Sequence, residues 1–221
     1  KRFSCELAIV LLLLTCAGVS LSWYAPLTID DAFITFTYAK HAAHGDGLVF
    51  NIGERVEATS SMLWALLLVP FELLSIGSLV GSKILGLLFY CGSLYFSYRA
   101  AEHFLPSFPT LGSRRCIALL APLLAASSAT FAAWTLQGME NALVAFLLIY
   151  GTYQFACELE KRSGTLSCVP IALMGLARPE GFAFYGLFIF LRLAFACWIG
   201  FLTSRWLVWW CLGLAVVIVP Y

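Results

Sequence analysis

The chain has 221 residues, of which 62% are hydrophobic and only 11% are charged, and its mean hydropathy is +0.91. Soluble domains carry about 25% charged residues, so a soluble globular fold could not cover this much apolar surface. The net charge of +1 excludes nucleic-acid binding driven by overall positive charge.

The first apolar run, Leu7–Tyr24, is long enough to cross a bilayer, which takes about 20 mainly apolar residues. Lys1 and Arg2 precede it and aromatic residues end it, so we expect an anchor with its N-terminus in the cytoplasm. A signal peptide is the alternative, but no small-residue cleavage site follows the run.

Seven further apolar runs follow along the chain: Ser61–Ser75, Leu79–Tyr98, Cys116–Trp134, Ala142–Cys157, Leu166–Ala177, Phe182–Trp198 and Trp206–Tyr221. The first and fifth of these are short for a span, and such interrupted segments often surround a site at membrane depth. We therefore predict an all-α, polytopic transmembrane bundle with about seven spans and juxtamembrane helices on the outer face. The last run is cut at Tyr221, so we expect a fragment that lacks its C-terminal part.

Three groups of basic residues lie in or around loops between the later apolar runs: Arg99 with Arg114 and Arg115, Lys161 with Arg162, and Arg192 with Arg205. Cytoplasmic loops carry an excess of Lys and Arg. All three groups face the cytoplasm only if Ser61–Ser75 does not cross fully, which leaves residues 25–80, 135–141 and 178–181 outside. A full span at Ser61–Ser75 would instead place the Arg-rich loop outside, and we favour the first arrangement.

The longest polar segment, residues 25–60, differs from ordinary lipid-facing helix. Asp30 suits the N-cap of a helix over Asp31–His44, and Gly45 suits its C-terminal end. The spacing of His41 and His44 permits a metal site, but without a third ligand we interpret them as the end of a surface helix.

Several motifs in this segment resemble the first outer loop of bacterial GT-C glycosyltransferases. The closest branch is the one that contains the mycobacterial terminal arabinofuranosyltransferases. The matching residues are Asp30-Asp31-Ala32-Phe33-Ile34, Tyr38-Ala39, the run from Gly45 to Asn51, the run from Gly53 to Glu57, Ser61, and Leu63-Trp64. Two later motifs agree in order: the run from Trp134 to Glu140, and Ala177-Arg178-Pro179-Glu180-Gly181. The resemblance covers residues 1–221 as the N-terminal membrane module of that family, with residues 25–60 as its outer catalytic loop.

The resemblance implies a glycosyltransferase of the bacterial inner membrane with its active site facing the periplasm. The donor would be a polyprenyl-phosphate sugar, the acceptor a hydroxyl of a glycan, lipid or protein of the cell envelope, and the anomeric carbon would invert. It leaves a divalent metal open, and implies no other cofactor.

The same resemblance assigns roles to particular residues. Asp30 is the expected general base, with Asp31 as the second candidate or as a metal or substrate contact. We expect Glu140 to contact a sugar hydroxyl or a metal, and Arg178 to bind the donor phosphate. The further candidates for substrate binding are Arg55, Glu57, Lys83 and Trp64.

Each candidate also has a structural interpretation. The acidic pair suits a helix start, Arg55 and Glu57 an ordinary solvated turn, and Lys83 a side chain that reaches from a helix to the interface. Trp64 suits the aromatic belt at a membrane surface, and Arg178 could pair locally with Glu180.

Two other functions stay open. A transporter or flippase of lipid-linked sugars would use similar helices, although such proteins usually contain internal repeats, which we do not find. A scaffold that has lost catalytic activity is the second. No Gly-rich nucleotide loop and no Cys/His zinc motif is present, which favours a lipid-linked donor over a nucleotide sugar.

Overall fold

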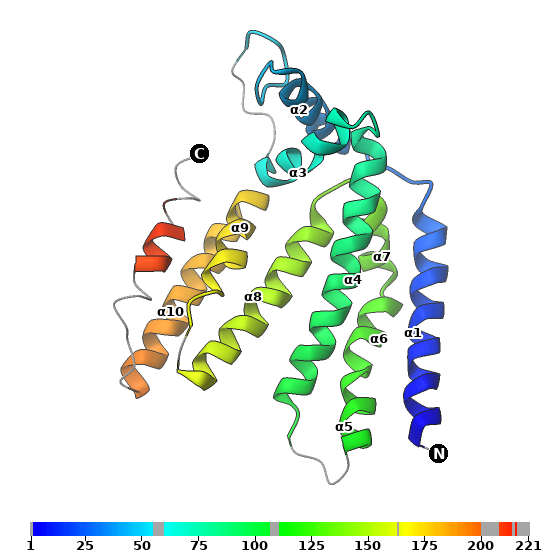
Figure 1. The fold of residues 1–221 in the computed structure, drawn as a ribbon, viewed down its shortest axis with the longest axis vertical. Helices are drawn as coiled ribbons and strands as arrows, with labels where there is room; N and C mark the ends of the chain where they lie inside the picture. The colour runs from blue at the N-terminus through cyan, green and yellow to red at the C-terminus, as the bar shows by residue number, and fades with distance from the viewer. Residues whose placement is uncertain are drawn as a thin grey trace.

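The computed structural model describes residues 2–54, 60–106, 111–162, 164–199, 208–213 and 215, and all regular secondary structure in these residues is helical. The predicted all-α class is therefore confirmed for this part of the chain. In chain order the helices are α1 (Arg2–Tyr24), α2 (Ala32–His44), α3 (Met62–Leu73), α4 (Ser78–Phe104), α5 (Leu111–Ala118), α6 (Leu120–Ser127), α7 (Ala129–Leu136), α8 (Asn141–Lys161), α9 (Cys168–Ala177) and α10 (Gly181–Ile199) (Figure 1).

Three of these helices are long and apolar enough to cross a membrane: α1 over Glu6–Tyr24, α4 and α8. A fourth candidate is the run from Arg114 to Leu136, which bends by 62° after Ser127. The apolar parts of α3, α9 and α10 are shorter. The structure thus supports three to four spans by length and composition, where the sequence predicted about seven.

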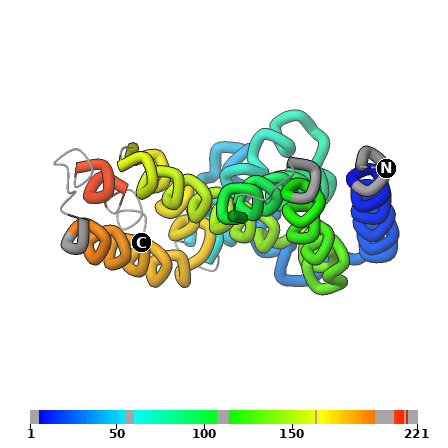
Figure 2. The backbone as a smooth tube through the Cα atoms, turned by 90° about the horizontal axis from the view of Figure 1, so that it is seen from below, coloured from blue at the N-terminus to red at the C-terminus, as the bar shows by residue number. Residues whose placement is uncertain are grey.

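The helices stand beside one another in a long, narrow array, with α1 at one edge and α10 at the other (Figure 2). Neighbouring helices pack against one another: α1 packs on α6 and α7, α4 packs on α6 and α8, and α9 packs on α8 and α10. The outer face of α1 exposes large apolar side chains, such as Leu11 and Leu14. An apolar surface of this size on a membrane helix is a lipid-facing surface.

Helices α2 and α3 lie across one end of the array, which we call the α2–α3 end (Figure 1). Helix α1 finishes at this end and α4 begins there, so the chain between them does not cross the array. At about 1.5 Å per residue, the 12 residues of α3 span about 18 Å, well short of a bilayer core of about 30 Å. This geometry agrees with the arrangement in which Ser61–Ser75 stays on one side.

The balance of charge differs between the two ends of the array. The described acidic residues at the α2–α3 end are Asp30, Asp31, Asp46, Glu54, Glu72, Glu140 and Glu180, against Lys40, Lys83 and Arg178. At the opposite end the described basic residues Arg99, Arg114, Arg115, Lys161 and Arg162 lie with the acidic residues Glu6, Glu102, Glu158 and Glu160. Such a bias favours the basic end as the cytoplasmic one.

Two apolar runs differ from the prediction. Cys116–Trp134 was expected as one helix, but Ser128 ends α6 and begins α7, where its side chain accepts a hydrogen bond from the Phe131 amide at 3.3 Å. A side chain that caps a new helix interrupts the old one.

Arg192, expected at a cytoplasmic loop, is instead buried inside α10 with 3% exposure.

We predict that the α2–α3 end faces outward. In a background without reactive cysteines, a membrane-impermeant maleimide should label Asp46→Cys and Glu180→Cys in intact cells, because both positions are exposed at this end. Arg115→Cys and Lys161→Cys, exposed at the other end, should be labelled only after permeabilisation. The reverse pattern would invert the orientation.

Candidate functional site

The connection between α7 and α8 is a turn held by hydrogen bonds to two of its backbone carbonyls. Gly138 adopts a φ of +93°, which L-residues rarely adopt. Its carbonyl accepts a hydrogen bond from the Trp64 indole Nε1 at 2.9 Å, and the Gln137 carbonyl accepts one from the Ile29 amide at 3.1 Å. The segment before α2, the helix α3 and the α7–α8 turn are therefore fixed to one another.

Packing at Gly138 leaves no space for a side chain. A Cβ atom at this position would lie 2.8 Å from Cβ of Ala32 and 3.1 Å from Cζ of Phe36. Both residues belong to a buried cluster that also contains Trp64 and Ala177. Helices α2, α3, α8 and α9 thus share one apolar core directly beneath the turn.

Glu140 and Arg178 form an ion pair on this core. Arg178 Nε donates to Glu140 Oε1 at 2.7 Å, across 38 residues of sequence. Glu140 is 1% exposed, whereas the side chain of Arg178 is 37% exposed. The local pair between Arg178 and Glu180 that the sequence allowed is not the one formed. The motif that ends at Glu140 and the motif that contains Arg178 are therefore in direct contact.

The other oxygen of Glu140 is available. Its Oε2 atom is buried and has no hydrogen-bond partner among the described residues, and the same holds for Nδ2 of Asn141. Buried polar atoms are nearly always paired with protein, water or ligand.

Asp30 and Asp31 lie immediately before α2 and are both exposed. The cap position falls on Asp31, not on Asp30 as predicted, and its side chain makes no capping hydrogen bond. The predicted C-terminal end at Gly45, with a φ of +89°, is confirmed. The Ile29 amide is hydrogen-bonded to the Gln137 carbonyl, in the turn that leads to Glu140. The acidic pair begins at the residue that follows Ile29.

Two other candidates have structural contacts. The Lys83 ammonium donates to the carbonyl of Ala25 and to that of Leu27, the latter at 3.2 Å, which ties α4 to the segment before the acidic pair. Trp64 is 0% exposed, so its ring offers no face to a sugar in this structure. Arg55 and Glu57 lie outside the described residues.

No family model, curated protein or solved structure matches this chain. Function is therefore inferred from its own residues. Among the described residues, no group of three or more His, Cys, Asp or Glu side chains is arranged to hold a metal ion.

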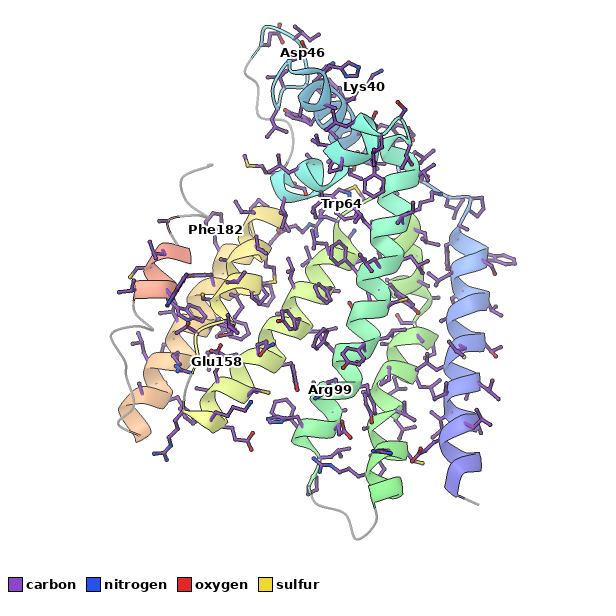
Figure 3. The ribbon with its side chains drawn as sticks, in the orientation of Figure 1. Lys40, Asp46, Trp64, Arg99, Glu158 and Phe182 are labelled. Atoms are coloured by element: carbon purple, nitrogen blue, oxygen red, sulfur yellow. The ribbon has the colours of Figure 1, made fainter. Side chains whose placement is uncertain are left out.

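The sequence analysis missed a second buried carboxylate, Glu158, in the opposite half of α8 (Figure 3). Its two oxygens accept from the Ser167 amide at 2.8 Å and from the Ser167 hydroxyl at 2.7 Å. The bonds fix Ser167, the N-cap residue of α9, to the end of α8. An acidic residue directly after the apolar run Ala142–Cys157, with a serine at the start of the next run, was the available signal.

The structure predicts that Gly138→Ala destabilises the protein more than Gly53→Ala. Both glycines have a φ near +90°, but a Cβ at Gly53 would meet no atom within 4 Å. The backbone strain is therefore shared, and the difference measures the clash at Gly138, about 1–3 kcal/mol. Equal shifts in unfolding free energy, measured in detergent, would show that the turn has room to adjust.

We also predict that Arg178→Ala destabilises by about 3–5 kcal/mol, because it leaves the buried Glu140 carboxylate without a counter-charge. Adding Glu140→Gln in the same chain should restore part of this loss. Glu180→Ala, at the exposed neighbouring position, is the matched control and should change stability by no more than about 0.5 kcal/mol. Similar losses from the Arg178 and Glu180 variants would argue against the pair.

Proposed function

We propose that this protein is an integral-membrane glycosyltransferase of the GT-C type. It would move a sugar from a polyprenyl-phosphate donor to an acceptor hydroxyl at the outer face of a bacterial inner membrane. The α2–α3 end would carry the active site, with the hydrocarbon tail of the donor in the bilayer beside it.

The observation that carries this proposal is the contact between segments far apart in the sequence. The acidic pair, the turn at Gly138 and the Arg178 break are joined by the Ile29–Gln137 hydrogen bond and the Glu140–Arg178 ion pair. These three segments are the ones that resemble motifs of the GT-C glycosyltransferases. Neither acidic side chain of the pair is needed as a helix cap, which supports a chemical role.

The proposed reaction is a single displacement. The acceptor oxygen forms a bond to the anomeric carbon as the bond from that carbon to the phosphate oxygen breaks, and the electron pair leaves with polyprenyl phosphate. The acceptor proton passes to the Asp30 carboxylate, which acts as general base. Attack opposite the leaving group inverts the anomeric configuration.

Arg178 would bind the donor, and Glu140 would hold the Arg178 side chain in place. The exposed part of the Arg178 guanidinium can bind the phosphate and stabilise its growing negative charge. The Glu140 carboxylate fixes that guanidinium through Oε1, so its role here would be to position Arg178.

A scaffold without catalytic activity is the second candidate. The observation in its favour is that the Glu140–Arg178 pair also joins α8 to the end of α9, where a purely structural pair would serve as well. A scaffold would need neither an exposed Asp30 nor a free oxygen on Glu140.

The decisive test is transfer from radiolabelled polyprenyl-phosphate sugars by the purified protein in liposomes. Asp30→Asn should lower the transfer rate by a factor of about 100 or more, as expected when a general base is lost, while unfolding stays near wild type because the side chain is exposed. Asp46→Asn, an exposed acid on the same outer segment, is the matched control and should transfer normally.

Near-normal turnover in Asp30→Asn combined with loss in Asp31→Asn would move the base to Asp31. No transfer by the wild-type protein from any of several donor sugars, with donor lipid bound, would favour the scaffold.

A further inference from the structure

A pocket of about 230 Å³ lies at the basic end of the array, opposite the proposed active site. Its walls come from Arg99, Glu102, His103, Arg114 and Tyr153. These residues belong to α4, α5 and α8, so the pocket opens between neighbouring helices. Figure 3 places Arg99 near that end of α4.

Arg99 is held there mainly by neutral groups. It donates to the hydroxyls of Tyr95 at 3.0 Å and Tyr153 at 3.3 Å, and its guanidinium carbon lies 5.9 Å from the centre of each ring. The nearest carboxylate contact, to Glu102, is 3.9 Å long. The positive charge is thus oriented by aromatic residues and only weakly neutralised.

Arg114 supplies a second cation with spare donor capacity. Its Nη2 atom donates to the Glu102 carbonyl, while its buried Nε atom has no hydrogen-bond partner among the described residues. Two guanidinium groups that line one pocket are an arrangement that binds phosphate oxygens.

The surroundings of the pocket favour a lipid as the source of that phosphate. Tyr95 and Phe104 flank it on α4 and are 52% and 63% exposed, and Ile117 on α5 is 37% exposed. The ring of Phe104 lies against that of His103, with centroids 5.3 Å apart. A headgroup in the pocket would therefore place its acyl chains along apolar and aromatic surface.

We propose that this pocket binds the phosphodiester headgroup of an anionic membrane lipid at the predicted cytoplasmic face. Basic pockets between transmembrane helices on that side are known to select anionic headgroups. Arg99 and Arg114 bind the phosphate oxygens, and the Tyr153 hydroxyl orients Arg99. Glu102 competes with the phosphate for Arg99. The inference is independent of the reaction at the other end of the array.

The test is native mass spectrometry of the purified protein titrated with phosphatidylglycerol, with phosphatidylcholine as the zwitterionic comparison. The wild-type protein should retain phosphatidylglycerol in preference to phosphatidylcholine. Arg99→Gln and Arg114→Gln should each weaken its binding about tenfold, the factor for one lost charge-assisted hydrogen bond. Arg115→Gln is the matched control, since Arg115 follows Arg114 but is exposed and does not line the pocket.

Glu102→Gln keeps the shape of the side chain and removes the competing charge, so it should strengthen phosphatidylglycerol binding. This gain guards against losses that come only from poor folding. Equal weakening by Arg115→Gln and Arg114→Gln, or no gain in Glu102→Gln, would overturn the site. Displacement of the lipid by inorganic phosphate at equal concentration would overturn the lipid assignment and leave a soluble anion as the ligand.

Discussion

The fold around the proposed active site depends on the turn at Gly138. Its carbonyl and that of Gln137 bind a tryptophan from α3 and the backbone before α2, so two segments that lie outside the array are fixed to α7 and α8. A left-handed glycine with no space for a Cβ atom makes this junction intolerant of change. An unpaired carbonyl facing the buried Trp64 ring would cost about 1–3 kcal/mol, which gives the junction one definite geometry.

The ion pair of Glu140 and Arg178 extends this constraint to α9. A buried carboxylate is expensive in an apolar bundle unless a cation is close. Glu140 meets that need with one oxygen and keeps the other free, while Arg178 keeps part of its guanidinium exposed. A pair that was only structural would be expected to satisfy all its polar atoms within the protein. The exposed part of the Arg178 guanidinium is what the proposed chemistry on a phosphorylated sugar would use.

Local patterns in the sequence predicted much of this arrangement. The apolar runs marked most helices, and the helix ending at His44 before Gly45 was placed within one residue at its start. The positions of Arg and Lys predicted that Ser61–Ser75 would remain at one end. What failed was set by tertiary contacts. The bend at Ser128 depends on one side chain capping a new helix, and the burial of Arg192 depends on the packing of α10 among its neighbours. The contact between Glu140 and Arg178 joins residues 38 apart, which no local pattern specifies.

The two ends of the array differ in their balance of charge. Carboxylates outnumber cations at the α2–α3 end, whereas the opposite end carries the pocket lined by Arg99 and Arg114. The most direct test of the central claim is a structure of the protein with a non-hydrolysable polyprenyl-phosphonate analogue of the donor. We predict the phosphonate beside Arg178, with the anomeric carbon of the sugar within reach of Asp30. An analogue bound only at the Arg99 pocket, or one whose anomeric carbon is out of reach of both Asp30 and Asp31, would contradict the account.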